Sequence, residues 1–253
     1  MPALVLVTLF LIALLLACIE TGRRVRLRQQ QKDSSSGLGV IDGAVFGLLG
    51  LLLAFAFSGA DSRFEARRQL IVQETNAIGT AYLRVDLLPA NAQPAIRADF
   101  RKYVDARIAF YTDLRHDRTR ANSDLASSNA LQLKIWRESV AAATQTSSPA
   151  VLTLVVSSLN DMIDITTTRS VALQTHPPLM IFALLLALAL ASSLIAGYGM
   201  GEQRKRPWLH TLVYAVALTI TLYTIMDLEF PRFGLVRVDR YDQALVKQRD
   251  SMR

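Results

Sequence analysis

The chain has 253 residues, of which 51% are hydrophobic, and a formal net charge of +7 at pH 7. This apolar fraction is high for a soluble protein of this length, and the single cysteine, Cys18, excludes a disulfide framework or a cysteine/histidine zinc site. The positive charge does not indicate nucleic-acid binding, because the densest basic runs, 23–28 and 204–206, adjoin apolar segments, which is typical of membrane topology signals.

Four apolar segments are each near the length that a helix needs to cross roughly 30 Å of hydrocarbon at ~1.5 Å per residue. They cover residues 3–19, 38–60, 179–200 and 208–228. The sequence therefore predicts an all-α membrane protein with four transmembrane helices in two hairpins, and a four-helix water-exposed domain between spans 2 and 3. Its parts are an N-terminal helix with a basic linker (1–37), the second transmembrane helix (38–60), the helical domain (61–177), the hairpin of spans 3 and 4 (178–228) and a C-terminal tail (229–253).

The distribution of basic residues predicts the orientation in the membrane. The linker 20–37 and the turn 201–207 are rich in Lys and Arg, whereas the residues before the first span carry no charged side chain. By the positive-inside rule, both turns face the cytoplasm and the domain 61–177 lies outside. Residues 15–18 faintly resemble a lipoprotein cleavage box, so lipidation of Cys18 is the alternative to an ordinary membrane cysteine.

The second span carries two stripes of residues at steps of three and four. Small residues form the first stripe, which predicts close backbone contact with another helix: Gly39, Gly43, Gly47, Gly50, Ala54 and Ser58. The second stripe consists of Asp42, Phe46, Leu49, Leu53 and Phe57. Aromatic and leucine rings of this kind form hydrophobic constrictions in channels. The functional alternative is that either stripe faces a narrow pore, with Asp42 near its cytoplasmic mouth.

Polar residues also recur along the fourth span, at His210, Tyr214, Thr221, Thr224 and Asp227. Polar side chains in a membrane helix usually point away from lipid. Two interpretations follow, namely hydrogen bonds between helices and a wet path or ligand site.

The domain 61–177 lacks a strand pattern and predicts four helices. The first can continue the second span and ends at Leu88-Pro89, and the second begins near Pro94. The polar run 116–123 is expected to close this second helix. The third covers about 125–144, and the fourth runs from Ser148-Pro149 to about Thr175, before the prolines at 177 and 178.

Charged residues on the first and last of these helices indicate structural ion pairs, with Glu74, Arg84, Asp161, Asp164 and Arg169 as the candidates. An ion-binding ring in an oligomer is the alternative. The chain shows no nucleophile with a base, no metal-binding His-Glu-x-x-His motif and no phosphate loop. The sequence therefore predicts no enzyme, no cofactor and no metal site.

Several long runs resemble the bacterial bestrophin-like membrane domain, a family of uncharacterised function. They are GLLGLLLAFAFSG at 47–59, RRQL at 67–70, ETNAIGTAYLR at 74–84, DLLP at 86–89, NDMID at 160–164 and DLEFPRFGLVR at 227–237. The resemblance covers about residues 37–252 and implies a multi-pass protein of the bacterial inner membrane. The order of the parts is similar to that of the bestrophin anion channels, which assemble as pentamers around their second span and keep the helical domain in the cytosol.

By this resemblance, Phe46, Leu49, Leu53 and Phe57 are the candidate neck of a pore. We therefore expect a homo-oligomeric integral membrane protein, pentameric by resemblance, that conducts small anions with its second span lining the pore. The expected partners are the lipid bilayer, further copies of the chain and small anions, but no nucleic acid. The alternative is a non-conducting membrane scaffold or sensor whose helical domain binds a partner.

Overall fold

The computed structural model describes residues 2–29, 38–114, 116–202, 208–232 and 234–252, apart from the side chains of residues 2–4, 38 and 202. Helix makes up 89% of the chain, and the described ranges contain no strand, so the fold class is all-α. Four helical stretches are long and apolar enough to cross a membrane: Val5–Gln29, Gly39–Leu87, Pro149–Gly199 and Trp208–Glu229. These features confirm the prediction of an all-α membrane protein with four candidate spans.

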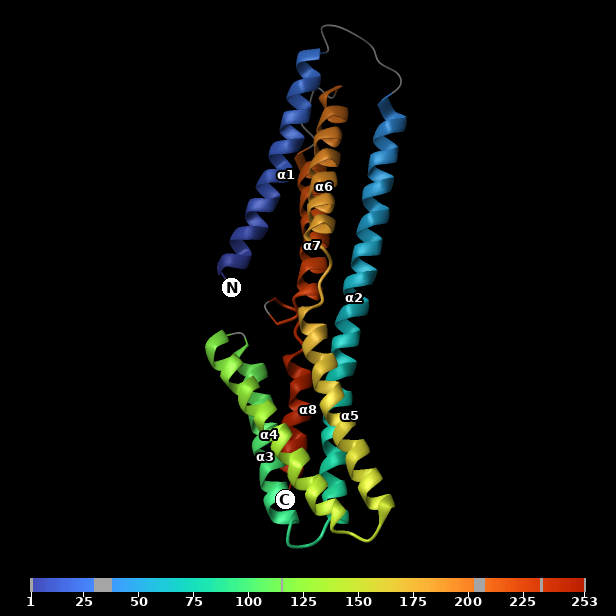
Figure 1. Ribbon diagram of the computed structural model, residues 1–253. Coiled ribbons are helices and arrows are strands. Elements are labelled where there is room, and N and C mark those ends of the chain that lie inside the picture. Colours follow the sequence, from blue (N-terminus) through green and yellow to red (C-terminus); the bar gives the residue numbers. More distant parts are fainter. Residues whose placement is uncertain (1, 30–37, 115, 203–207, 233, 253) are drawn as a thin grey trace. The chain divides into compact units, whose positions relative to one another are not determined.

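The chain divides into two compact units, and the first contains Met1–Arg63 and His176–Phe230. This unit holds most of the apolar helices: α1 (Pro2–Gln29), the first half of α2 (Leu38–Arg84), α6 (Leu179–Gly199) with the 3-10 turn η2 (Met200–Glu202), and α7 (Trp208–Glu229) (Figure 1). Its buried core is small and centres on Leu15, Leu49, Ala189, Ala215 and Leu218. Many large apolar side chains on these helices are exposed, which suits helices that are surrounded by lipid rather than water.

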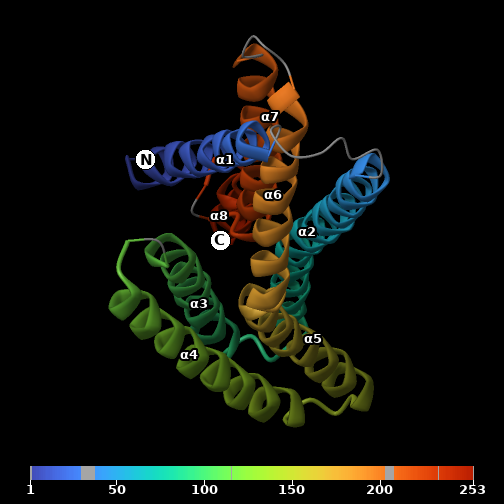
Figure 2. The ribbon, with the colours of Figure 1, turned by 90° about the horizontal axis from the view of Figure 1, so that it is seen from above.

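Helix α1 crosses α6 with its backbone in close contact (Figure 2). A Cβ atom added at Gly22 would lie 1.9 Å from the carbonyl oxygen of Leu194, and one added at Gly197 would lie 1.8 Å from that of Ile19. Only glycine fits at these two positions, because the backbone of the other helix fills the space of a side chain. Neither glycine belongs to a regular stripe in the sequence, so periodicity alone did not mark this contact.

The second unit contains Phe64–Thr175 and Pro231–Arg253. Its elements are the second half of α2, the 3-10 turn η1 (Val85–Leu87), α3 (Gln93–Asp113), α4 (Arg118–Thr144), α5 (Pro149–Gln174) and α8 (Asp239–Ser251). Each helix contributes a fully buried side chain to one hydrophobic core, namely Ile78, Phe100, Ile135, Met162 and Leu245. The residues after Phe230 are therefore an integral part of this unit, whereas the sequence pattern had separated them as a tail.

Local sequence signals explain where the helices of the second unit begin. Pro94 and Pro149 lie in the first turns of α3 and α5, as expected from their missing N–H groups. Helix α4 begins earlier than predicted, because the carboxylate of Asp117 accepts hydrogen bonds from the backbone N–H groups of Thr119 at 2.9 Å and Arg120 at 3.1 Å. The polar run 116–123 therefore opens α4.

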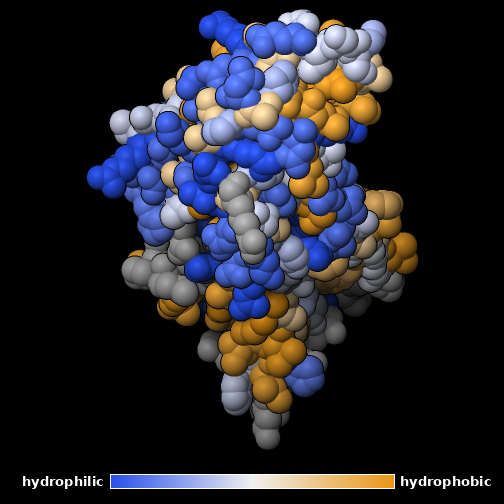
Figure 3. All heavy atoms as spheres, turned by 90° about the horizontal axis from the view of Figure 1, so that it is seen from below, coloured by the Kyte–Doolittle hydropathy of each residue, from blue (hydrophilic) through white to orange (hydrophobic). Residues whose placement is uncertain are grey.

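Figure 3 shows the polar character of the surface seen from below, where hydrophilic residues predominate and hydrophobic residues form separate patches.

Candidate functional site

Helix α2 is continuous from Leu38 to Arg84 and presents an exposed face along its length. In its apolar half, the small-residue stripe is exposed, and a Cβ atom added at Gly39, Gly43, Gly47 or Gly50 would meet nothing within 4 Å. The same exposed side carries two larger apolar side chains, Leu51 and Phe55. Beyond Ser58 it carries mostly polar residues, some of them charged: Asp61, Glu65, Gln69, Val72, Gln73, Asn76 and Thr80. These positions share one side of the helix because their spacing follows its period of 3.6 residues. Within the described part of the chain, no side chain or backbone packs against the space above these four glycines.

The stripe that contains Phe46, Leu49 and Leu53 lies on a different side of α2. Leu49 is only 4% exposed and packs in the small core of the first unit, with Leu53 against the same core. The ring of Phe46 makes an edge-to-face contact with Tyr214 of α7, with 6.4 Å between the ring centroids. Asp42 is half-buried, and Phe57 is exposed. Phe46, Leu49 and Leu53 thus make contacts within their own chain, and the pore-lining role of this stripe stays a prediction.

The polar residues of the fourth span make mainly structural hydrogen bonds. The hydroxyls of Tyr214 and Ser192 in α6 lie 2.8 Å apart, which links the two helices. Thr221 and Thr224 donate to backbone carbonyls of α7 itself, one turn earlier. Near the end of α7, the buried carboxylate of Asp227 accepts a hydrogen bond from Tyr223 at 3.4 Å, while His210 is exposed near its start. These contacts favour the interpretation of hydrogen bonding within and between helices.

A polar cluster surrounds the buried carboxylate of Glu229 in the first unit. Arg63 donates to it from Nε at 2.8 Å, and Nδ1 of His176 lies 3.0 Å from its other oxygen. The His176 ring also stacks on Phe230, with 4.5 Å between the ring centroids. Arg63, His176 and Phe230 are the terminal residues of the segments that make up the first unit. The cluster therefore holds the ends of these segments together.

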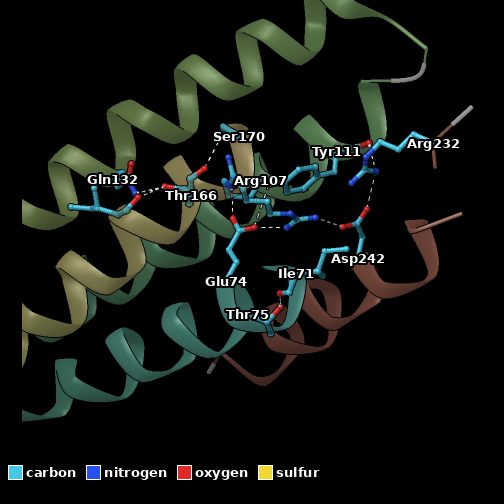
Figure 4. Close-up of polar contacts among 12 residues, drawn as sticks. Ile71, Glu74, Thr75, Arg107, Tyr111, Gln132, Thr166, Ser170, Arg232 and Asp242 are labelled. Carbon is cyan, nitrogen blue, oxygen red and sulfur yellow. Dashed lines mark hydrogen bonds and ion pairs between the residues drawn. The ribbon is translucent and has the colours of Figure 1, made fainter. Parts of the chain in front are cut away.

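The second unit buries a network of ion pairs around Glu74 of α2 (Figure 4). Arg107 of α3 donates from Nε to the carboxylate at 2.7 Å, the Tyr111 hydroxyl donates at 3.2 Å, and Arg169 of α5 also pairs with it. Arg169 makes a further ion pair with Asp242 of α8. The network therefore joins four helices of this unit through their charged side chains.

Arg232 extends the network on its other side. Its guanidinium group lies 3.0 Å from the carboxylate of Asp242 and 3.1 Å from that of Asp239. Burial by itself would raise the pKa of Glu74, but the positive charges of Arg107 and Arg169 outweigh burial and hold this pKa below its ordinary value. Glu74 is thus held as a carboxylate, which is the charge state that the surrounding arginines require.

Two of the five predicted ion-pair residues, Glu74 and Arg169, meet in this network. Arg84 instead donates to the backbone carbonyl of Leu154, while Asp161 and Asp164 are exposed and make no ion pair within the described ranges. Sequence reasoning missed Arg107, Arg232 and Asp242 as partners. A signal for Arg107 was present, since it stands on the apolar side of its helix, where a charged side chain needs a buried partner. Among the described residues, no group of three or more His, Cys, Asp or Glu side chains could hold a metal ion.

Solved bacterial membrane proteins share this arrangement of helices. Three variants of a bacterial bestrophin homolog from Klebsiella pneumoniae are similar to the chain, with TM-scores of 0.73, 0.69 and 0.68 at 16%, 15% and 15% sequence identity. The similarity covers 96%, 96% and 98% of this chain and 99%, 98% and 98% of those chains. The chain therefore has the helical fold of these solved membrane proteins.

The sequence model of the Bestrophin-like domain family matches residues 9–241 of the chain. The chain belongs to this family, which confirms the resemblance seen in the sequence. No curated protein matches the chain. Because a shared fold does not establish a shared activity, the function has to be argued from the exposed face of α2 and its chemistry.

Proposed function

We propose that the protein is a homo-oligomeric ion channel of the bacterial inner membrane, with its pore lined by the exposed face of α2. The observation that carries this proposal is the change of chemistry along one unbroken helix. The face is apolar and rich in small residues over a length that suits a bilayer, and it becomes polar beyond Ser58, at Asp61, Glu65, Gln69, Gln73, Asn76 and Thr80. Small residues at this spacing in the apolar half are typical of contacts between helices rather than of a face surrounded by lipid.

The small residues support assembly of several copies around α2. Glycine and alanine allow membrane helices to approach closely, and the contact that this stripe predicts is not made within one chain. The number of copies, five, rests on the resemblance to the bestrophins. In this proposal the pore wall includes Leu51 and Phe55, in place of Phe46, Leu49 and Leu53, which pack against other helices of the same chain.

Leu51 and Phe55 are proposed to form the narrowest, water-excluding part of the pore. Their exposed fractions are 53% and 66%, and both follow Gly47 on the exposed face at steps of four residues. Rings of leucine and phenylalanine make a constriction that conducts only when water enters it. A barrier of this kind depends on the volume of the side chains, so truncation should lower it.

Leu51→Ala and Phe55→Ala are therefore expected to raise the conductance of the purified protein in planar bilayers, each by roughly tenfold, for ~1.4 kcal/mol off the barrier. Leu209→Ala on α7 and Phe10→Ala on α1 are matched controls, because these side chains are exposed to nearly the same extent, 56% and 68%, on other helices. The controls should conduct like the wild type. If the wild type and all four variants form oligomers but conduct no current, the channel proposal is wrong, and a scaffold or sensor is favoured.

We also propose that the helical domain 61–177 is extracytoplasmic and that the basic turns 20–37 and 201–207 are cytoplasmic. A cysteine at Asn122, which is exposed on α4, should react with an impermeant thiol reagent on intact cells after Cys18 is replaced by serine. Cysteines at Ser35 and Gln203, which lie outside the described residues, should resist the reagent. The reverse labelling pattern would place the domain in the cytosol, as in the bestrophins.

A further inference from the structure

A small cavity lies beside Arg232, which Figure 4 shows at one end of the ion-pair network of the second unit. Its volume is about 240 Å³, and its lining residues come from α3, α8 and the chain around them, all within this unit. Charged, polar and apolar side chains share the wall, among them Ile108, Thr112, Arg232, Asp239, Asp242 and Val246. Sites for drug-sized ligands measure ~300–1,000 Å³, so this cavity suits a smaller metabolite.

Arg232 brings an unsatisfied hydrogen-bond donor to the cavity. The residue is only 7% exposed, and its Nη1 atom lies 3.1 Å from the carboxylate of Asp239 and 3.0 Å from that of Asp242. Its buried Nε N–H group, by contrast, makes no hydrogen bond within the described ranges. A buried donor without an acceptor is costly, because it has lost its hydrogen bond to water. The cavity therefore favours a ligand with an acceptor oxygen beside Arg232.

The charges around the cavity already balance one another. Three arginines and three carboxylates make up the network, namely Arg107, Arg169, Arg232, Glu74, Asp239 and Asp242. A ligand with a net charge would add an uncompensated charge to a largely buried site, which is unfavourable at low dielectric. A zwitterion adds one charge of each sign and keeps the balance.

Asp239 provides a place for the positive group of such a ligand. Its Oδ1 atom accepts from Arg232, whereas its Oδ2 atom makes no ion pair in the part of the chain that the structure describes. The side chain is 41% exposed, so a ligand can reach it. Ile108 and Val246 add aliphatic surface to the same cavity.

We propose that this cavity binds a small zwitterionic amino acid. The carboxylate of the ligand accepts the Nε N–H group of Arg232, its ammonium group binds Asp239, and its side chain lies against Ile108 and Val246. This inference goes beyond conduction, because it assigns the binding of a solute to the helical domain. It does not depend on a pore along α2.

Isothermal titration calorimetry of the full-length protein in detergent tests the site, with L-alanine, L-valine and L-glutamine as zwitterionic probes. At least one of the three should bind. Propionate and propylamine each carry only one of the two charged groups. They should bind at least about tenfold more weakly than that amino acid, because each lacks one charge-assisted hydrogen bond.

Two variants remove the two proposed contacts. Asp239→Asn removes the negative charge at nearly constant shape and should weaken binding of the amino acid by about tenfold. Arg232→Lys keeps the positive charge but removes the Nε N–H group, and it should weaken binding at least as much. Asp105→Asn on α3 is the matched control, since Asp105 is another exposed carboxylate of this unit that pairs with an arginine, Arg249. Its dissociation constant should equal that of the wild type.

The proposal is overturned if none of the three amino acids binds the wild type, or if Asp239→Asn binds as tightly as the wild type. Equally tight binding of propionate would mean that the cavity takes anions, and this result overturns the proposal too. The thermal midpoint of each variant shows whether it is folded. The comparison of the amino acids with propionate and propylamine uses the wild type alone, so it decides the question even where a variant does not fold.

Discussion

Gly197→Ala is expected to separate α1 from α6 and to destabilise the first unit by about 3 kcal/mol or more, at the upper end of the range for overpacking. The new methyl group would lie 1.8 Å from the carbonyl oxygen of Ile19. A flexible side chain could rotate away from such a contact, but a helix backbone can only move as a whole. The whole crossing would then have to open, including the hydrogen bond of 3.2 Å between Arg26 and the Tyr198 hydroxyl.

The measurement is the thermal midpoint and the monodisperse fraction of the protein in detergent. Gly22→Ala tests the same crossing from α1, since its Cβ atom would lie 1.9 Å from the carbonyl oxygen of Leu194. Gly199→Ala is the matched control, because it lies two residues further along α6 and its Cβ atom would meet nothing within 4 Å. Equal midpoints for Gly197→Ala and Gly199→Ala would show that α1 and α6 do not cross as described.

Glu74→Ala is expected to destabilise the second unit by about 3–5 kcal/mol, because it leaves the buried guanidinium groups of Arg107 and Arg169 without their shared carboxylate. Asp86→Ala is the control, since Asp86 pairs with Arg97 at the surface and such pairs contribute about 0–1 kcal/mol. Chemical unfolding followed by circular dichroism compares the two variants. Similar losses in both would mean that Glu74 is not the centre of a buried network.

The lowered pKa of Glu74 adds an expectation about pH. Because this pKa is lower in the folded protein than in the unfolded chain, the unfolded chain binds the proton more readily. The stabilisation is complete above the ordinary pKa of a glutamate and is lost as the pH falls through the lowered value. Glu74→Gln should therefore be less stable than the wild type at neutral pH, and its stability should fall less steeply in acid. If the free energy of unfolding fell equally steeply with decreasing pH in the wild type and in Glu74→Gln, this assignment would be contradicted.

Several parts of the fold were accessible from local sequence signals. The apolar segments predicted four candidate spans because crossing a bilayer requires about 20 consecutive apolar residues, a property of each segment alone. Pro94 and Pro149 marked the starts of α3 and α5 for an equally local reason, the lack of a backbone N–H group. The charge pattern predicted Glu74 and Arg169 as candidates for ion pairs, together with Arg84, Asp161 and Asp164, but the sequence could not assign a partner to any of them.

The two stripes of α2 show what the helical period predicts and what it leaves open. The sequence determined that small residues form one stripe and that Phe46, Leu49 and Leu53 form another, since both follow from the helical period. Only the tertiary structure decided that the bulky stripe packs against helices of its own chain and that the small stripe is free. In lipid, hydrophobicity does not distinguish a packed face from an exposed one, so the choice depends on which side chains are large enough to bridge two helices.

The sequence by itself determined the membrane class, the helical content and the starts of several helices, because hydropathy, helical period and capping act over a few turns of chain. The tertiary structure alone decided the crossing at Gly22 and Gly197, the partners of Glu74 and the place of α8 in the second unit. Each of these depends on contacts between residues far apart in the chain: Arg107 pairs with Glu74, and Asp242 pairs with Arg169, where the hydrophobic core brings α3, α5 and α8 together with α2. Burial then makes their pairing obligatory, since an unpaired charge in that core would be strongly destabilising.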